Sequence, residues 1–323
     1  MGSALTGPEA VERARQLVPV LAERAAKAEA LRRLPDETFA DLVASGLFRI
    51  TQPRRFGGSE LDLADAFGVI NQLSQGCGST GWTYALLTSH GWFLSLFPDE
   101  AQREVWEADP DAVMSTSFSG GVPPEPVPGG GWRIGAGTWR ADVLAATTPG
   151  REVNDGPLYK LPLVGSWQVF LTTAATGIAR AAMDAWIVRT KSRVNPYTKA
   201  PVTADPAGLA HLGSAAARIE AAETLIQQVA RRVTADVEST GGVADETRAR
   251  GRRDYAFAVR LCVEAVEELF LAAGASTLDE SSVIQRCWRD VHAVAQHQAN
   301  NLDVALRSWG ERALGLGDGL RFG

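Results

Sequence analysis

The stretch that decides the fold is residues 245–273, which read DETRARGRRDYAFAVRLCVEAVEELFLAA. It and three other segments, residues 167–193, 206–239 and 282–310, each exceed the usual length of a globular helix, about 8–20 residues. Short links marked by Gly or Pro separate the four segments. Four long helices with such links predict an up-and-down bundle over residues 163–323.

Residues 1–111 also have the pattern of helices. One apolar helical face recurs at three- and four-residue steps, at Leu17, Leu21, Ala25 and Ala28. Pro35, followed by Asp36 and Glu37, predicts the start of the next helix, and Gly46 is expected to end it. Further helices are expected over residues 63–74, 79–97 and 98–108.

The middle of the chain, residues 112–162, turns to Gly, Pro, Thr and Val. Short strands are expected over residues 112–119, 132–139 and 143–148, too few for a large independent β-domain. The predicted fold is therefore mainly α. An N-terminal helical domain (1–111) and a C-terminal four-helix bundle (163–323) flank a reduced β-region.

Composition excludes several classes of protein. Lys and Arg total 32 against 38 Asp and Glu, a net charge of −6, which argues against a nucleic-acid partner. No stretch reaches the roughly 18 apolar residues of a membrane span, and no secretory signal is visible at the start. Three cysteines without a CxxC pair indicate no disulfide framework, so we expect a cytoplasmic protein.

The segment 282–310 carries the most suggestive polar residues. If it is one helix, Asp290 and His297, seven residues apart, lie on one face, with Asn301 one turn beyond. An imidazole there could give or take a proton near neutral pH. The structural alternative is that Asp290 pairs with a neighbouring arginine and His297 makes a core hydrogen bond.

Other candidates also have two readings. His90 lies on an apolar helix between Trp82 and Trp92, where it is either a ligand contact or a satisfied core residue. Ser117 is a hydroxyl donor or an ordinary strand residue. Arg253 belongs to a basic cluster that suits a phosphate or carboxylate, or simply faces solvent. The four histidines lack the spacing of a metal site.

Five short runs carry a family resemblance: LRRLPDET (31–38), QPRRFGG (52–58), CGSTGW (77–82), HGW (90–92) and QRCWRDVH (285–292). The first two resemble the acyl-CoA dehydrogenase superfamily. The others, with His297, resemble its branch of two-component flavin monooxygenases, the hydroxyphenylacetate and steroid-phenol hydroxylases.

The resemblance implies a helical domain, a middle β-domain and a four-helix bundle that builds a tetramer. It also implies reduced FMN or FAD between β-domain and bundle, delivered by a flavin reductase. The histidine that matches His297 faces the flavin and the substrate phenol in that branch. His90 and a serine near Ser117 hold the substrate, and Arg253 falls in the helix that contacts the flavin phosphate.

The chain departs from that branch in its middle. The branch has a Ser-Ser-Gly element that touches the flavin ring, where this chain reads Arg140-Ala141-Asp142, and a later Gly-Thr-Gly-Ser loop has no counterpart. A large flat ligand with one wall missing stays exposed to water. We therefore expect a degenerate flavin site that holds no cofactor.

The resulting hypothesis is cofactor-independent acid/base chemistry, a cyclisation, dehydration or isomerisation of a small secondary-metabolite-type molecule. His297 is the expected acid or base, oriented by Asp290 or Asn301. The expected substrate-binding residues are His90, Ser117, Trp82 and Trp92. Two alternatives stay open: a reduced-flavin-dependent monooxygenase acting on a phenolic or polyketide-like substrate, and a non-catalytic subunit. In each case the bundle is expected to form a homodimer or homotetramer.

Overall fold

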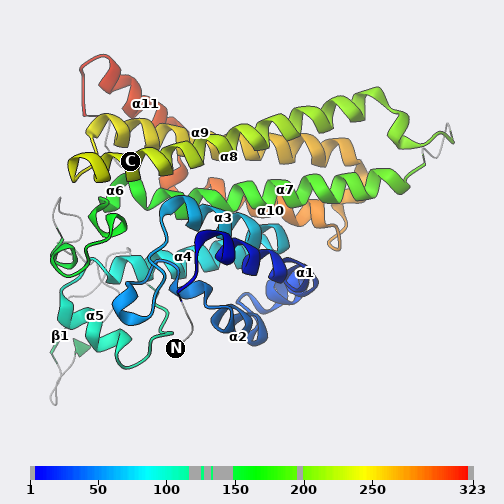
Figure 1. Cartoon of the computed structure of the whole chain (residues 1–323). Coiled ribbons are helices and arrows are strands. Elements are labelled where there is room, and N and C mark those ends of the chain that lie inside the picture. Colours follow the sequence, from blue (N-terminus) through cyan, green and yellow to red (C-terminus); the bar gives the residue numbers. More distant parts are fainter. Residues whose placement is uncertain (1–3, 116–124, 127–131, 134–147, 195–198, 319–323) are drawn as a thin grey trace.

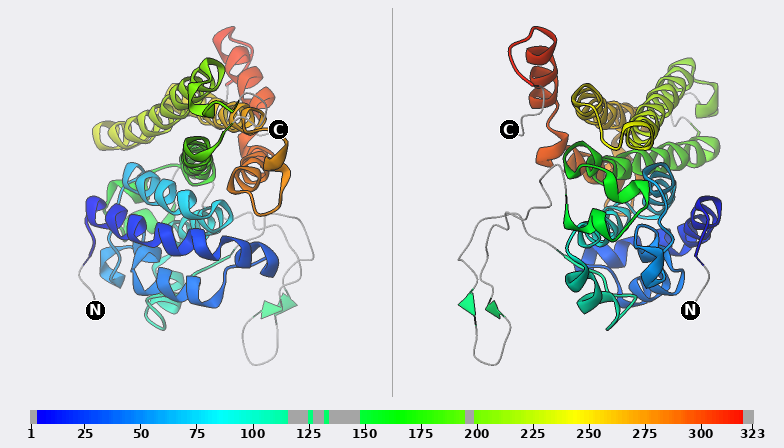
Figure 2. Two further views of the ribbon diagram at one scale, coloured as in Figure 1. Left: turned by 90° about the vertical axis from the view of Figure 1, so that its right-hand side faces the viewer. Right: turned by 60° about the vertical axis from the view of Figure 1, so that its left-hand side comes forward.

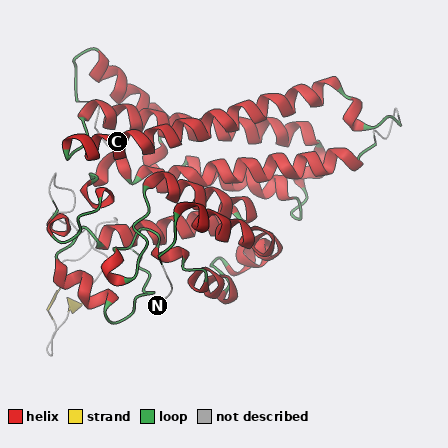
Figure 3. Cartoon of the chain, in the orientation of Figure 1, coloured by secondary structure: helices red, strands yellow, loops and turns green. Residues whose placement is uncertain are grey.

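The computed structural model describes residues 4–115, 125–126, 132–133, 148–194 and 199–318. Almost all of this part is helical (Figure 3). The N-terminal helices lie on one side of α7, and α8 and α9 lie on the other (Figures 1 and 2). The predicted mainly-α fold is confirmed. None of the described helices is long and apolar enough to cross a membrane.

The N-terminal domain holds five α-helices: α1 (Gly7–Leu31), α2 (Asp36–Ala44), α3 (Leu63–Gly76), α4 (Gly78–Leu94) and α5 (Asp99–Trp106). Local signals explain their ends. The Thr6 hydroxyl accepts the Glu9 amide, and the Glu9 carboxylate accepts the Thr6 amide, which is a capping box at the start of α1. Gly46 has a φ of +73° just beyond α2, as the sequence predicts, because glycine adopts that conformation at little cost.

The C-terminal region is the predicted bundle, preceded by the short α6 (Leu163–Ser166). Its helices are α7 (Gln168–Ser192), α8 (Pro206–Thr240), α9 (Asp245–Ala273), α10 (Val283–Ala295) and α11 (Leu302–Ala313). Helix α7 contacts α8, α9 and α10 within the bundle, and α3 across the domain boundary. The close approach of α3 needs Gly177, since a Cβ there would lie 2.3 Å from the Asn71 carbonyl oxygen.

The prediction of one continuous helix over residues 282–310 is wrong. Helix α10 ends at Ala295, and His297 has an extended backbone (φ −64°, ψ 135°) that begins the 3₁₀ turn Gln298–Asn300. The Asn301 side chain then accepts the Val304 amide and caps α11. Histidine and asparagine side chains here bond to nearby amides, which favours a new helix start over continuation. His297 therefore lies at a break and not on a helical face.

The middle region shows little sheet in its described residues. Glu125–Pro126 (β1) pairs antiparallel with Trp132–Arg133 (β2). Residues 112–115 form no strand, and neither does Thr148, so the expected strands fail there. Trp132 and Arg133 of β2 are the first two residues of the strand expected over residues 132–139. The remaining residues of the three expected strands lie outside the described residues.

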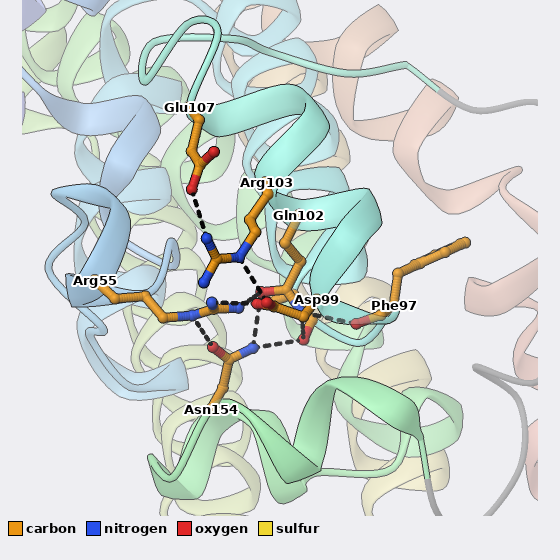
Figure 4. Close-up of polar contacts among 8 residues, drawn as sticks. Arg55, Phe97, Asp99, Gln102, Arg103, Glu107 and Asn154 are labelled. Carbon is orange, nitrogen blue, oxygen red and sulfur yellow. Dashed lines mark hydrogen bonds and ion pairs between the residues drawn. The ribbon is translucent and has the colours of Figure 1, made fainter.

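A polar network anchors the chain where it returns from the middle region, over Pro149–Glu152 and Pro157–Lys160 (Figure 4). Arg55 donates to Asn154 Oδ1 at 3.0 Å and also pairs with Asp99. Asn154 Nδ2 donates to the Ser95 carbonyl oxygen at 2.8 Å and to Gln102 Oε1 at 3.0 Å. The network fixes the returning segment against the N-terminal domain before the bundle begins.

Candidate functional site

A cavity of about 400 Å³ lies between α4, α7 and α10. Trp82 from α4 and Ile178 from α7 give it apolar walls. Asp290 and Ala293 from α10 line it too, and His297 lines it from the break after α10. The cavity is therefore lined by His297 and Asp290, two of the predicted catalytic residues, and by the indole ring of Trp82.

His297 is oriented by the backbone. Its Nδ1 accepts the amide of Ala299 at 3.2 Å, so the neutral ring carries its proton on Nε2. Burial lowers the pKa of His297, which keeps the ring neutral at pH 7. His297 consequently offers an Nε2–H donor.

Aromatic rings continue from His297 in a row, of which Trp82 lines the cavity. The His297 ring lies 5.6 Å from Trp82 and 6.3 Å from Trp167, both edge-on, measured between ring centroids. Trp167 lies 5.2 Å from Phe93, and Phe93 lies 5.5 Å from His90. This row of rings therefore connects Trp82, His90 and Phe93 of α4 with Trp167 and His297, which are distant in the sequence.

His90 has the opposite tautomer. Its Nδ1 donates to the Met114 carbonyl oxygen at 3.2 Å, so the neutral ring keeps its lone pair on Nε2. Burial lowers the pKa of His90 as well. His297 and His90 thus have opposite tautomers, and of the two His297 is the one among the residues that line the cavity.

Asp290 has no hydrogen bond or ion pair with any described residue. Burial raises its pKa to about 6, against a weaker opposing effect of Arg289. The sequence alternative that Asp290 pairs with Arg286 or Arg289 is wrong, because both guanidinium groups pair with Glu29 of α1. Asp290 is also not bonded to His297, whose Nδ1 is held by the Ala299 amide.

The structure separates other candidate residues from the cavity. Asn301 is exposed and caps α11. Trp92 is fully buried and donates to the Leu158 carbonyl oxygen at 3.1 Å, so it belongs to the core. Ser117 lies outside the described residues. No group of three or more His, Cys, Asp or Glu in the described ranges could hold a metal ion.

Arg253 lies on α9, away from the residues that line the cavity. Its guanidinium contacts Asp254 through Nε and Nη2 and lies 4.7 Å from the ring centre of Trp309. These contacts hold the side chain in place and leave the Nη1 hydrogens for a further acceptor.

Sequence reasoning missed two groups at this site. Trp167 contacts His297 across 130 residues of chain, and the Ala299 amide fixes the His297 tautomer. No spacing rule reports either contact. The only signal in the sequence was that Trp167 stands directly before an apolar segment, which the structure shows to be the buried helix α7.

Comparison with known proteins places these elements in a family. The acyl-CoA dehydrogenase N-terminal domain matches residues 10–108, and the acyl-CoA dehydrogenase C-terminal domain matches residues 169–302. The chain belongs to the acyl-CoA dehydrogenase superfamily. The two matches cover the helical domain and most of the bundle, so the family resemblance is confirmed over both.

The superfamily members that resemble this chain are oxygenase components. The oxygenase subunit HsaA of a flavin-dependent monooxygenase from Rhodococcus jostii is 26% identical, over 95% of this chain and 98% of its own. The oxygenase component of p-hydroxyphenylacetate 3-hydroxylase from Acinetobacter baumannii is 26% identical, over 97% of this chain and 90% of its own. The crystal structure of HsaA from M. tuberculosis has a TM-score of 0.87 at 26% identity, over 98% of this chain and 100% of that one.

These relatives correct two expectations. Cofactor-independent cyclisation, dehydration or isomerisation is wrong as the main hypothesis, because the proteins that align along nearly the whole chain are flavin-dependent monooxygenases and hydroxylases. The expectation of no cofactor is wrong for the same reason. The inference failed because it took a shortened middle region to mean a lost site.

The shortening itself is real. The alignment with the Rhodococcus jostii subunit spans 375 positions, more than the 323 residues of this whole chain. Parts of the relative therefore have no counterpart here. The matched domains leave residues 109–168 between them, which is where the sequence predicts the reduced β-region.

The described residues fit one side of a flavin site. A reduced flavin is a flat ring system with polar edges, and the row from Trp82 through His297 to Trp167 presents aromatic surface with one N–H donor among it. Arg253, with Nη1 hydrogens to spare, suits a phosphate. This fit is a property of the helical domain and the bundle, both of which the family matches cover.

Proposed function

We propose that this chain is the oxygenase component of a two-component monooxygenase that hydroxylates a phenolic aromatic compound. It would use reduced FMN or FAD delivered by a separate flavin reductase. The observation that carries the proposal is His297, whose Nδ1 accepts a backbone amide and whose Nε2–H is left as a donor in a cavity lined by Trp82, on a chain that aligns nearly end to end with oxygenase components.

The residues of this chain have distinct tasks in that reaction. A bound reduced flavin supplies the activation of O₂ and the oxygen atom that enters the ring. Trp82 and Trp167 would orient the aromatic substrate and exclude water. The His297 Nε2–H would donate to the phenolic oxygen and stabilise its anionic form, which makes the ring carbon beside it more nucleophilic.

Two further residues complete the proposal. His90 stays a proposed substrate contact, as the family resemblance implies, and it is linked to His297 through the rings of Phe93 and Trp167. Arg253 would hold the flavin phosphate through the hydrogens of Nη1. Residues 116–124, Ser117 among them, lie outside the described part and carry no role here.

The partners follow from the proposal. The relatives named as oxygenase components imply a reductase, so a flavin reductase is the proposed protein partner. We also propose a homodimer or homotetramer through the bundle. Large apolar side chains on bundle helices are exposed, which supports contact with another copy: Val188, Leu209 and Leu271 are 70%, 56% and 69% exposed.

Oxygen-free titration with reduced FMN and reduced FAD tests the proposal. We expect saturable binding of one of them at micromolar concentration, with weaker binding of its oxidised form. Arg253→Ala should weaken binding of reduced FMN more than that of reduced riboflavin, which lacks the phosphate. No binding of either reduced flavin, by protein that is folded by circular dichroism, would support the non-catalytic subunit instead.

A further inference from the structure

The cavity presents a donor and an acceptor at separate points. His297 Nε2–H is the donor. Asp290 is the acceptor, and about 8 Å of helix axis separate it from the end of α10 at Ala295, where the chain turns toward His297. Between them the wall is Trp82 and Ile178. A ligand that satisfied both groups would be longer than a single small phenol.

Asp290 is held in place by packing and not by hydrogen bonds. A Cβ on Gly78 would lie 2.6 Å from Asp290 Oδ2 and 2.8 Å from the Ile178 side chain, so a larger residue at this position of α4 would force one of these side chains to move. The carboxylate therefore lies directly against the first turn of α4, at the cavity wall. Ser79, the next residue, lines the same cavity.

The charges around Asp290 are already balanced. Arg286 and Arg289 face it from α10, and Glu29 faces it from α1. The two guanidinium groups share the Glu29 carboxylate, with Arg286 Nε at 3.4 Å. Two positive and two negative groups thus form a neutral cluster, to which α4 and α7 add no charge at the cavity wall.

What Asp290 lacks is a hydrogen-bond donor. Asp290 is partly buried, and a partly desolvated carboxylate is stabilised by a hydrogen-bond donor that a ligand brings into the cavity. A cationic donor would add a net charge to a neutral cluster, whereas a hydroxyl would not. The balance of charge therefore favours a neutral hydroxyl over an amine.

We propose that Asp290 accepts a hydrogen bond from a second hydroxyl of the substrate, at the end of the cavity away from the phenol that His297 binds. The substrate class is a hydroxylated aromatic of about two rings with polar groups at both ends, which a cavity of about 400 Å³ can hold. This rests on the proposed function for the phenol at His297, and it names which phenols the site selects.

Binding of a matched pair of rigid phenols tests this without flavin or oxygen. The probes are 4,4′-dihydroxybiphenyl and 4-hydroxybiphenyl, which differ by one hydroxyl, and the readout is quenching of tryptophan fluorescence at pH 7.5. We expect the diol to bind about tenfold more tightly or better, since a hydrogen bond to a charged group is worth about 1.5–3 kcal/mol. Asp290→Ala should bring the ratio of the two affinities close to one.

Two controls make the result decisive. Asp290→Asn keeps the side-chain shape and should retain part of the preference, which separates a lost hydrogen bond from a misfolded site. A third probe replaces the distal hydroxyl with an aminomethyl group. If the amine binds most tightly and only with Asp290 present, the hydroxyl assignment is overturned in favour of a cation.

The inference and the proposed function fail separately. Equal affinities for diol and mono-ol in the wild type, or a diol preference that survives in Asp290→Ala, overturns the role of Asp290 even if phenols are hydroxylated. A diol preference that depends on Asp290, in a protein that hydroxylates nothing, supports the binding role and counts against the monooxygenase.

Discussion

Asp290 shows how a single residue can be held at a cost to stability. Its pKa is raised from 3.8 to about 6 by burial, so between these values the folded protein binds a proton there that the unfolded chain does not. The contribution of the protonated acid is complete below about pH 4 and is lost as the pH rises through 6. At pH 7 the ionised carboxylate therefore destabilises the fold.

Asp290→Asn should consequently raise the free energy of unfolding at pH 7.5, by up to about 3 kcal/mol for a shift of this size. The gain should shrink toward pH 4, where the wild-type acid is protonated in both states. Urea unfolding at several pH values measures it.

The matched control is Glu29→Gln, which should change the free energy of unfolding in the opposite direction. A hydrogen bond from Arg289 lowers the pKa of Glu29, so its contribution is present above pH 4.5 and is lost as the pH falls. Its removal should destabilise at pH 7.5. If Asp290→Asn destabilises there as well, Asp290 has a partner that this account denies it.

Gly78 makes a second prediction at the residue scale. Gly78→Ala places a Cβ within 3 Å of Asp290 and Ile178, and overpacking of this kind costs about 1–3 kcal/mol. The melting temperature should fall. Gly213→Ala, in α8 with no atom within 4 Å of the new Cβ, should instead stabilise by up to about 1 kcal/mol. Equal effects of the two changes would contradict the close packing at Gly78.

At the scale of elements, the break between α10 and α11 matters most. It turns His297 out of a helix and lets the Ala299 amide set its tautomer. A straight helix would satisfy the Ala299 amide with a carbonyl oxygen four residues earlier and leave Nδ1 of His297 without that donor. The catalytic geometry proposed here therefore depends on where one helix stops and the next begins.

Asn301 is the cap that starts the second helix. Asn301→Ala should cost about 1 kcal/mol and speed amide hydrogen exchange within α11 (Leu302–Ala313) more than within α10. Gly310→Ala, an open position inside α11, should slow exchange in the same segment. Uniform exchange across residues 283–313 in both variants would mean that the two helices behave as one.

At the scale of the whole molecule, sequence reasoning reached the architecture but not the site chemistry. Periodicity and the Gly and Pro links predicted the bundle and the helix over residues 245–273, because long amphipathic helices leave a strong local signal. The break at His297 was missed because capping competes with helix continuation over only a few residues. Its contacts with Trp82 and Trp167 join distant segments, which no local pattern encodes.

The cofactor expectation failed for a related reason. A missing segment shows what a chain lacks, but the row of rings around His297 is built from α4, the start of α7 and the α10–α11 break, all of them described in the structure. The relatives that match along nearly the whole chain include a flavin-dependent monooxygenase, which has the positions that are absent here. The shortened middle region therefore leaves the cavity residues of α4, α7 and α10 in place.

The most direct test of the central claim is incorporation of oxygen from ¹⁸O₂ into a phenol by the purified chain, with a flavin reductase, NADH and FMN or FAD. We predict a hydroxylated product that carries one ¹⁸O atom. His297→Ala should lower the rate of hydroxylation by about 10²-fold or more. His211→Ala, which changes a partly exposed residue paired with Glu268, should match the wild type. Product that forms equally well without flavin, or a His297→Ala variant as active as the wild type, would contradict the account.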